Sequence, residues 1–421
     1  MTIIALLIRL VFTAVFYFLP DVWMHGAVRA AFPKHPKKTL KRYWLLNIAL
    51  FLITSSGFLL MQFMDGSLAR LNLYFLGVFV ALLFAKLFVA LFLFFGEDLW
   101  RVPYSLFTRK KRSVASGEKA PILINRRTFL SRTALIAGML PFTGFIYGMV
   151  RGRYAFTVHR ETLNFTDLPD AFNGLSIVQI SDLHMGSWDK AATEHVEEIV
   201  RIINGFGADL VFFTGDIVNS RANEMDGWYD ILKKITARVG KYSILGNHDY
   251  GDYVNWKTEE EKEVNLSLVK NIHPAIGFQL LLNTHTGIER NGQKLYIAGV
   301  ENWGKGDFPK FGDLDKAYAD IPDDAFTILL SHDPSHWREK VLHHTHIPHL
   351  VLSGHTHGFQ MGVETPAFRF SPSQFVYGEW AGLYTEGRSH LYVNRGLGTV
   401  GYPGRLGIWP EITHITLRKK S

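Results

Sequence analysis

The chain has 421 residues, enough for two or more domains, and 48% of them are apolar, with 32 Phe. It contains no Cys, which excludes disulfides and thiolate metal sites and leaves His, Asp and Asn as candidate ligands. The net charge of +7 is unevenly divided, because residues 1–150 carry 18 Lys and Arg against 5 Asp and Glu, and the rest of the chain carries 27 against 33. The second part is mildly acidic and shows no basic stripe interleaved with aromatic residues, so the charge does not indicate nucleic-acid binding.

Four apolar segments in the first part are expected to cross a membrane, because a hydrocarbon core of ~30 Å needs about 20 helical residues. They are Ile3–Leu19, Tyr43–Met64, Leu71–Phe95 and Thr133–Val150. Residues 1–150 are therefore predicted to form an all-α transmembrane region of about four helices, in a multi-pass protein of the cell membrane. Lys86 lies inside the third segment, where a charge indicates either a structural partner or a function.

Positive charge in the loops between these segments predicts the orientation of the chain. Arg29–Arg42 and Glu97–Arg132 are rich in Lys and Arg, whereas Asp65–Arg70 is not, so the positive-inside rule places the first two in the cytoplasm. Four spans then deliver the following domain to the extracytoplasmic side. Three arginines just after the fourth span oppose this assignment: Arg151, Arg153 and Arg160.

Arg126 and Arg127 precede the fourth apolar segment and resemble a twin-arginine export signal. A basic membrane flank that happens to hold two adjacent arginines is the alternative interpretation. Export would also place the C-terminal domain outside the cytoplasm.

Short apolar runs alternate with helix-like segments in residues 151–421, a pattern typical of an α/β domain. The predicted helices are Thr193–Asn204 and Thr258–Asn271. The predicted strands are Leu175–Ile180, Leu210–Phe213, Tyr242–Leu245, Leu295–Val300, Phe326–Leu330 and Leu350–Leu352.

All of these strands except Leu295–Val300 run into clusters of potential metal ligands. The clusters are Ser181–His184, Thr214–Asp216, Gly246–Asp249, Ser331–Asp333 and Gly354–His357. A single Asp or Asn after a strand is most simply a turn residue or a helix cap. Five such endings in one domain instead predict a shared site, because sites in α/β sheets collect at the carboxyl ends of strands.

In this order, the blocks D-x-H, G-D, G-N-H-D, a lone His and G-H-x-H resemble the calcineurin-like metallophosphoesterase superfamily, over about Gly174–Leu417. The closing stretch, Val393–Ile412, is similar to a bacterial membrane-associated branch in which some members cleave the pyrophosphate of UDP-diacylglucosamine. The resemblance implies two packed β-sheets flanked by helices. It also implies a metal-dependent hydrolase of phosphoester or pyrophosphate bonds.

The resemblance further implies two divalent metal ions. The first would be held by Asp182, His184, Asp216 and His357, and the second by Asp216, Asn247, His332 and His355. Imidazole, carboxylate and amide ligands together suit Mn²⁺, Fe or Zn²⁺. The bridging carboxylate of Asp216 fits two cations ~3.5 to 4 Å apart, which would supply a metal-bound hydroxide as the nucleophile.

Three further residues are candidates for catalysis or substrate binding. His248 is the predicted proton donor to the leaving group, and Asp249 is predicted to orient and charge it; a histidine that only supports the ligands is the alternative. Arg405 is a candidate phosphate clamp, with a solvated loop arginine as the competing interpretation. The histidines of His343–His349 precede their strand and are expected to be exposed.

The function predicted from the sequence is hydrolysis of a membrane-associated phosphoester substrate, with a lipid among the candidates and no nucleic acid expected. The competing class is a membrane-anchored scaffold or receptor whose metal-bound domain does not catalyse a reaction. A third alternative keeps the enzyme but turns its domain inward, toward a nucleotide-linked lipid precursor.

Overall fold

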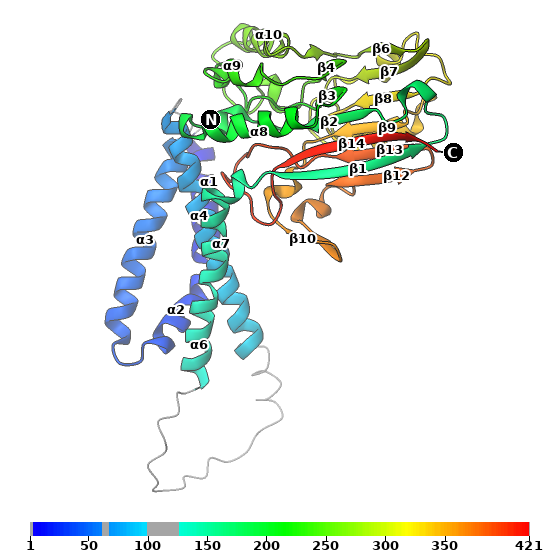
Figure 1. Cartoon of the computed structure of the whole chain (residues 1–421). Coiled ribbons are helices and arrows are strands. Elements are labelled where there is room, and N and C mark those ends of the chain that lie inside the picture. Colours follow the sequence, from blue (N-terminus) through cyan, green and yellow to red (C-terminus); the bar gives the residue numbers. More distant parts are fainter. Residues whose placement is uncertain (1–2, 61–66, 99–125, 421) are drawn as a thin grey trace. The chain divides into compact units, whose positions relative to one another are not determined.

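A computed structural model describes residues 3–60, 67–98 and 126–420 (Figure 1). The chain divides into two compact units, Met1–Met149 and Val150–Ser421, and each is described by itself.

The first unit is helical. Its elements are α1 (Ile3–Phe18), α2 (Asp21–Ala31), α3 (Pro36–Leu60), α4 (Ser67–Leu93), the π-helix η2 (Phe94–Asp98), α6 (Arg126–Ala137) and α7 (Met139–Val150). Within the described residues, three helical stretches are long and apolar enough to cross a membrane: Leu10–Ala31, Leu71–Gly96 and Arg126–Tyr154. This confirms an N-terminal region of long apolar helices.

The first and second predicted spans differ in detail from the structure. The first stretch extends beyond Leu19 to Ala31, with α1 and α2 separated at Pro20, whose missing N–H cannot continue a helix. The second predicted span falls on α3 as far as Leu60, and its last residues lie outside the described part of the chain. Most of the predicted loop Glu97–Arg132 also lies outside it, and Arg126 begins α6.

A polar cluster around Asp21 joins α2, α3 and α4 in the first unit. The Lys86 ammonium lies 2.9 Å from an Asp21 carboxylate oxygen and 3.1 Å from the carbonyl oxygen of Tyr17 at the end of α1. Asn47 donates to the same carboxylate at 3.0 Å, and the Tyr43 hydroxyl donates to its other oxygen. Asp21 and Lys86 are only 1% and 5% exposed, so the charge inside the third apolar segment has a buried structural partner.

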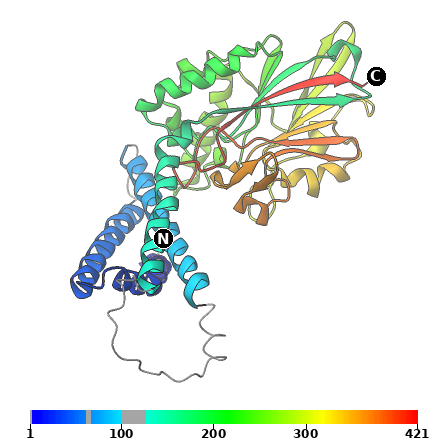
Figure 2. The ribbon, with the colours of Figure 1, turned by 60° about the horizontal axis from the view of Figure 1, so that its bottom comes forward.

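The second unit contains two six-stranded mixed sheets. The strand orders are β1-β14-β2-β3-β4-β5 and β12-β13-β9-β8-β7-β6, and in Figures 1 and 2 the last strand, in red, lies beside the green strands of the first sheet. The first sheet comprises β1 (Thr157–Phe165), β2 (Ser176–Ile180), β3 (Leu210–Phe213), β4 (Gly240–Ser243), β5 (Gln279–Leu280) and β14 (Glu411–Lys419). The second comprises β6 (Thr284–Arg290), β7 (Gln293–Gly299), β8 (Thr327–Leu330), β9 (Leu350–Ser353), β12 (Gly382–Glu386) and β13 (Ser389–Val393).

Because successive side chains of a strand point to opposite faces of the sheet, the apolar residues of one strand belong to two separate cores. In β3, Leu210 and Phe212 join a cluster shared with residues of the second sheet, such as Ile328, whereas Val211 and Phe213 pack on the opposite face. That opposite face is covered by α8 (Thr193–Gly205) and α10 (Glu259–Ala275). The second sheet packs in the same way under α11 (Leu314–Ala317) and α12 (Ser335–Glu339). The predicted architecture of two packed sheets flanked by helices is therefore confirmed.

One expectation about exposure is wrong. The histidines of His343–His349 are not all exposed, since His346 and His349 are 6% and 3% exposed. A ring nitrogen of His346 pairs with the Thr327 hydroxyl, and His349 pairs with the Asp167 carboxylate at 2.7 Å. These histidines pair with the buried Thr327 at the start of β8 and with the exposed Asp167, so they lie at the opposite end of β8 and β9 from the clusters of potential ligands.

Candidate metal centre

The predicted ligands follow neighbouring strands of both sheets. β2, β3 and β4 are adjacent and parallel, and the residues after them include Asp182, Asp216 and Asn247. β8 and β9 are adjacent and parallel in the other sheet, and His332 and the pair His355 and His357 follow them. Because the carboxyl ends of parallel strands share an edge, these side chains are brought to one place.

The backbone at this edge is strained. Five of the seven predicted ligands have a positive φ, a conformation that residues other than Gly rarely adopt: Asp182 (52°), His184 (46°), Asp216 (60°), His355 (72°) and His357 (50°). Neighbouring glycines make room for this arrangement, because a Cβ at Gly246 would overlap the Asp216 carboxylate and one at Gly354 would overlap that of Asp182. Such strain concentrates at functional sites, where the surrounding fold must support it.

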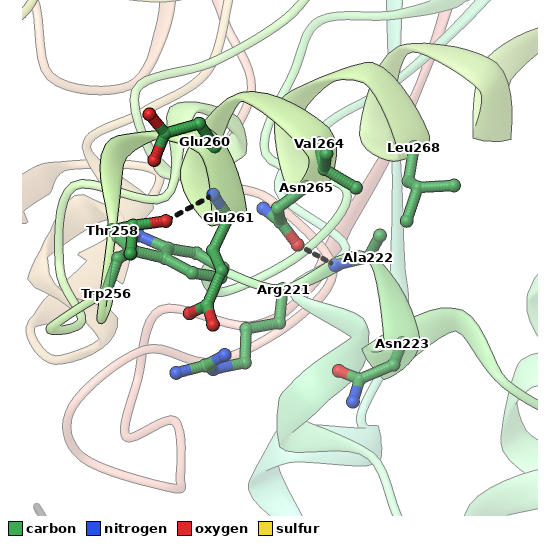
Figure 3. Close-up of a pocket in the computed structure, with 10 residues that line it drawn as sticks. All are labelled: Arg221, Ala222, Asn223, Trp256, Thr258, Glu260, Glu261, Val264, Asn265 and Leu268. Atoms are coloured by element: carbon green, nitrogen blue, oxygen red, sulfur yellow. Dashed lines mark hydrogen bonds between the residues drawn. The ribbon is translucent and has the colours of Figure 1, made fainter.

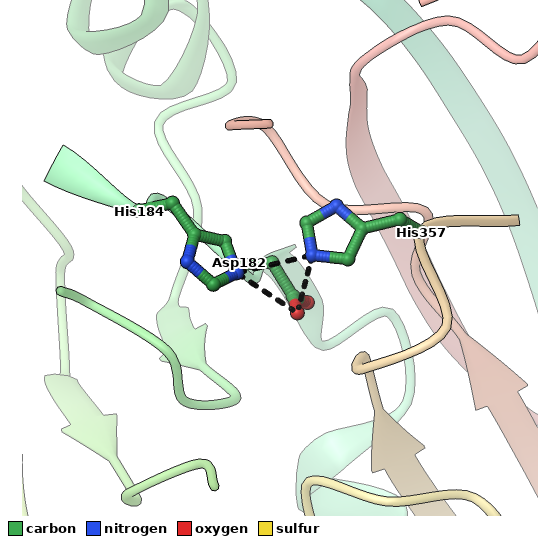
Figure 4. A group of neighbouring side chains, drawn as sticks. All are labelled: Asp182, His184 and His357. Atoms are coloured by element: carbon green, nitrogen blue, oxygen red, sulfur yellow. Dashed lines mark hydrogen bonds and ion pairs between the residues drawn. The ribbon is translucent and has the colours of Figure 1, made fainter. Parts of the chain in front are cut away.

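One group of potential ligand atoms surrounds the Asp182 carboxylate (Figure 4). Nε2 of His357 lies 3.2 Å from Oδ1 of Asp182, and Nε2 of His184 lies 3.1 Å from Nε2 of His357. In the neutral rings, at most one of these two nitrogens can carry a proton. At least one lone pair therefore points into the space between the rings and the Asp182 carboxylate.

A second group surrounds Asp216 and Asn247. Nε2 of His332 lies 3.2 Å from Oδ2 of Asp216 and 3.1 Å from Oδ1 of Asn247. Nδ1 of His355 lies 2.7 Å from the same Asn247 oxygen. Asp216 also reaches the first group, because its Oδ2 lies 3.5 Å from Nε2 of His184.

Hydrogen bonds behind the imidazoles orient the nitrogens that face these groups. Nδ1 of His184 pairs with the side-chain oxygen of Asn219 at 3.0 Å, and Nδ1 of His332 pairs with the carbonyl oxygen of Thr214 at 2.7 Å. With Nδ1 as the donor in both cases, each Nε2 keeps its lone pair for the site. This is the arrangement found behind metal-binding histidines.

The donor set fits divalent cations. Ligand atoms held ~2.0 to 2.2 Å from one ion lie roughly 3 Å apart, close to the separations within both groups. The electrostatics agree: burial by itself lowers the pKa of His332, but the facing Asp216 carboxylate raises it above its ordinary value. Buried carboxylates that shift a neighbouring imidazole in this direction make the potential at the site negative, which favours a bound cation.

Comparison with known proteins agrees with this arrangement of the site. Residues 5–153 match a family described as "Probable Calcineurin-like phosphoesterase, transmembrane domain", and residues 175–359 match one described as "Calcineurin-like phosphoesterase". The metallophosphoesterase YkuE of Bacillus subtilis is 32% identical over 305 residues, which cover 70% of this chain and 98% of YkuE. The chain belongs to the calcineurin-like metallophosphoesterases.

Of two further relatives, one is similar over the membrane region as well, and the other is named for the reaction that it catalyses. A transmembrane protein with a metallophosphoesterase domain from Danio rerio is 28% identical over 418 residues, covering 94% of this chain and 86% of that protein. The UDP-2,3-diacylglucosamine pyrophosphatase LpxG of Chlamydia trachomatis is 30% identical over 274 residues, covering 55% of this chain and 81% of LpxG. This metallophosphoesterase is therefore a membrane protein of a phosphoric ester hydrolase family, with His/Asp clusters typical of dinuclear members.

His248 lies beside both groups in the metallophosphoesterase unit. One of its ring nitrogens is within 4.8 Å of ligand atoms of His184 and Asp216, and its backbone N–H donates to Oδ1 of Asp216 at 2.8 Å. Nδ1 pairs with the carbonyl oxygen of Asn219 at 2.8 Å, and the ring stacks on Tyr253 with centroids 4.2 Å apart. Nε2 is therefore the nitrogen available for proton exchange.

Asp249 occupies a different position from the one expected beside His248. Its carboxylate accepts backbone N–H groups of Asp216, Ile217 and Gly246, each at 2.9 Å. Burial and the nearby Asp216 charge raise the pKa of Asp249 to about 7, against the effect of these donors. The carboxylate thus organises the loop that presents Asp216, a contact that sequence adjacency to His248 did not reveal.

Arg405 does not have the exposure that a phosphate clamp requires. It is fully buried, its guanidinium donates to the carbonyl oxygen of Gly398 at 2.7 and 3.0 Å, and Nη2 lies 3.1 Å from Nδ1 of His357. The side chain therefore supports the loop at Gly398 and the ring of His357 from behind.

Several residues around the metallophosphoesterase site were missed by sequence reasoning. The Tyr377 hydroxyl lies 2.7 Å from Nε2 of His355, and the Tyr253 hydroxyl accepts a hydrogen bond from the Asn247 amide at 2.7 Å. Asn219 contacts His184 and His248. These residues lie in loops whose return to the site has no periodicity or spacing that would reveal it.

The loop that carries Asn219 is held by α10. Asn265 donates to the carbonyl oxygen of Ser220 and accepts from the N–H of Ala222, each at 2.9 Å. Figure 3 shows the hydrogen bond between Asn265 and Ala222 on the wall of an open pocket of about 480 Å³, where the Arg221 guanidinium lies 4.4 Å from the centre of the Trp256 ring. The pocket contains none of the predicted ligands, and its wall fixes the loop that orients two histidines of the site.

Proposed function

We propose that this protein is a membrane-anchored enzyme that hydrolyses a phosphoester or pyrophosphate bond in a membrane-associated substrate. Residues 151–421 would form the catalytic domain and residues 1–150 its transmembrane helical region. The observation that carries the proposal is the convergence of lone pairs around Asp216 and Asp182, on strained backbone, at the carboxyl ends of strands from two sheets.

Two cations would occupy the site in this proposal, with Mn²⁺, Fe or Zn²⁺ as candidates. The residues assigned to hold them are Asp182, His184 and His357 on one side, Asn247, His332 and His355 on the other, and Asp216 between them. When bound, such cations acidify a water molecule to a hydroxide nucleophile and neutralise the charge of the phosphoryl oxygens.

The chain's own residues would contribute to catalysis by positioning the ligand groups and by transferring a proton. Asp249 and the glycines beside it hold the Asp216 carboxylate in place, so the site is preorganised before the substrate arrives. We assign His248 as the group that gives a proton to the leaving alkoxide through Nε2, because its Nδ1 is already paired with Asn219.

A lipid-linked substrate is the class that we favour. The chain is anchored in a membrane, which raises the effective concentration of the domain at that surface. The relative LpxG carries the name of a pyrophosphatase of UDP-2,3-diacylglucosamine, a lipid-linked pyrophosphate. Both observations support a bond close to the bilayer.

We place the catalytic domain on the extracytoplasmic side, following the positive charge of the first and third loops. Arg153, one of three arginines that opposed this orientation, is buried in the domain, where it donates to the carbonyl oxygen of Ser187 at 2.6 Å. It therefore does not act as a cytoplasmic membrane flank. A cysteine at the exposed turn residue Asn291, in this chain without native cysteines, should react with a membrane-impermeant reagent added outside intact cells.

The activity is tested with the full chain in lipid nanodiscs, stripped of metal and supplied again with Mn²⁺. A chromogenic phosphodiester and its monoester serve as substrates, and Asp216→Asn is compared with Asp226→Asn, which changes an exposed carboxylate. We expect metal to restore hydrolysis in the native chain and in the Asp226 variant but not in the Asp216 variant. The ratio of diester to monoester turnover would then narrow the substrate class.

A different result would favour the scaffold or receptor. If the folded chain binds metal but hydrolyses neither chromogenic esters nor a lipid-linked pyrophosphate, the domain binds without turnover. If no metal binds to the folded chain, the assignment of the ligands fails as well.

A further inference from the structure

An exposed apolar surface lies directly after the two histidines of the G-H-x-H block. It is formed by the hairpin of β10 (Val363–Thr365) and β11 (Phe368–Phe370), the preceding turn, and the short helix η11 (Pro372–Phe375) with the residue after it. We call it the hairpin patch, defined by Phe359, Val363, Phe368, Phe370, Phe375 and Val376. In Figure 1 the hairpin projects from the body of its unit, away from the two large sheets.

The exposure of the hairpin patch is concentrated rather than scattered. Phe375 and Val376 are 77% and 69% exposed, and Phe359 and Phe368 exceed one half. Among the described residues of 150–420, twelve large hydrophobic side chains are exposed, and six of them belong to this stretch of 18 residues. Contiguous apolar patches of this kind mark sites of protein or membrane interaction.

The hairpin patch carries very little exposed charge. Within residues 359–378, Arg369 is the one exposed charged side chain, and it donates to the carbonyl oxygen of Ala381 at 3.0 Å beside the Trp380 ring. Glu364 on β10 is neutralised by Arg395, which meets its carboxylate with two nitrogens at 2.5 and 3.0 Å. A single cation on an apolar surface complements an anionic lipid surface.

The patch is also built rigidly. Arg395 bonds Glu411 on β14 as well as Glu364, so it ties the hairpin to the first sheet. The N–H of Gly362 donates to the carbonyl oxygen of Leu406 at 2.9 Å, and the Ser371 hydroxyl donates to that of Gly358 at 2.6 Å. The fold therefore holds these phenylalanines in water in a fixed arrangement instead of folding them into a core.

The patch is continuous with the metal centre. Gly358 and Phe359 follow His357 directly, and Tyr377, next to Val376, pairs with Nε2 of His355. A surface bound at the patch would therefore lie next to the loops that carry two of the assigned ligands.

We propose that the hairpin patch inserts into the acyl region of the membrane in which the chain is anchored, with Arg369 at the level of the lipid headgroups. The apolar helices of the same chain keep this domain at a bilayer, where the effective concentration of lipid is high. Four exposed Phe together with one basic side chain are the combination that interfacial membrane-binding segments present to a bilayer. A protein occupant is the alternative that the test below distinguishes. The proposal concerns binding and does not require the hydrolytic function proposed above.

The test uses the absence of native cysteines. The full chain carrying Phe375→Cys, labelled with an environment-sensitive fluorophore, is reconstituted into vesicles of phosphatidylcholine and an anionic lipid, with a quencher on the acyl chains of some lipids. The matched control carries the label through Val239→Cys, an apolar residue 43% exposed elsewhere on the same unit. We expect a blue-shifted emission and quenching by the acyl-chain quencher for the label at 375, and neither for the label at 239.

Equal, water-like emission at both positions would overturn the proposal. So would protection at 375 without acyl-chain quenching, which would indicate a protein occupant, and self-quenching between labelled chains would identify that occupant as a second copy.

A second experiment measures the consequence of insertion without labels. The double variant Phe375→Glu, Val376→Glu should lower turnover of a lipid-embedded phosphodiester about tenfold relative to a soluble one, because it weakens approach to the bilayer. The control variant Val239→Glu, at an exposed apolar position elsewhere on the same unit, should leave that ratio unchanged. An equal ratio in both variants would contradict the proposal. If neither ester is hydrolysed by the native chain, the proposed function fails, and the fluorescence result still decides whether the patch inserts.

Discussion

The two units each bury a cluster of charged and polar side chains, and the clusters differ in whether their charges are balanced. In the first unit, the Asp21 carboxylate pairs with Lys86 and also accepts hydrogen bonds from Tyr43 and Asn47. In the second unit, Asp182 and Asp216 face imidazoles and an amide oxygen, and the backbone beneath them is strained.

This difference indicates what each cluster is for. A buried charge with its partner in place holds helices together and needs nothing further. A buried set of converging lone pairs costs stability until a cation is added, so the fold retains it for binding rather than for strength. The comparison therefore predicts that substitution mainly lowers stability in the first unit and mainly lowers activity in the second.

The largest effect is expected for Asp216→Asn. Because the carboxylate belongs to both groups of ligand atoms, kcat/KM for a phosphoester should fall at least about a thousandfold, or ~4 kcal/mol. The free energy of unfolding of the metal-free chain should change far less, since the amide keeps the shape of the side chain and an Oδ1 acceptor for the His248 N–H. Steady-state kinetics and chemical denaturation of the same preparation measure the two quantities. A loss of stability as large as the loss of activity would break the comparison.

The next largest effect is expected for Lys86→Met in the first unit. It leaves the Asp21 carboxylate buried without its cation, which should lower the free energy of unfolding by roughly 3 kcal/mol. The double variant with Asp21→Leu should recover part of this loss, and the exposed Lys34→Met should have no effect. Unfolding in mixed micelles measures the free energies of unfolding of the two single variants and the double variant. If the two single losses simply add in the double variant, the ion pair does not hold these helices together.

A third buried group gives a pH dependence that is independent of both clusters. Burial lowers the pKa of His273 to about 3 from 6.5, and neither ring nitrogen has a hydrogen-bond partner among the described residues. The unfolded chain therefore binds a proton between these values and the folded chain does not. Stability should fall as the pH falls below 6.5, by up to roughly 1.4 kcal/mol per pH unit from this residue.

Thermal unfolding at a series of pH values checks this dependence. His273→Phe should flatten the acid side of the profile, whereas His343→Phe, at an exposed position, should leave it unchanged. Parallel profiles for the native chain and the His273 variant would contradict the expectation.

The smallest effect is expected for Tyr377→Phe, which removes the hydroxyl 2.7 Å from Nε2 of His355. Groups that orient metal ligands typically contribute a factor of about 10 to 100 in metal affinity, so we expect a loss near tenfold. Titration of the metal-free chain with Mn²⁺ measures it, with Tyr229→Phe on α9 (Tyr229–Leu232) as a control away from the site. Unchanged affinity would limit Tyr377 to packing beside the hairpin patch.

Much of the fold could be predicted because it depends on local patterns. Runs such as Leu210–Phe213 and Leu350–Leu352 are long enough and apolar enough to be recognised as buried strands, and α8 and α10 begin within a residue of the predicted positions. Short or half-exposed strands such as β5 and β12 were missed, because their side chains carry no continuous apolar signal.

The sequence by itself determined the chemistry of this protein: which strand ends carry ligand-type residues, which glycines stand beside them, and which segments are apolar enough for a membrane. Only the tertiary structure decided how side chains far apart in the chain share one environment. It turned the Asp249 carboxylate toward the backbone near Asp216, buried Arg405 behind His357, and paired Lys86 with Asp21. The physical reason is that periodicity records which face of an element is buried, whereas a hydrogen bond or an ion pair depends on which other element packs against that face.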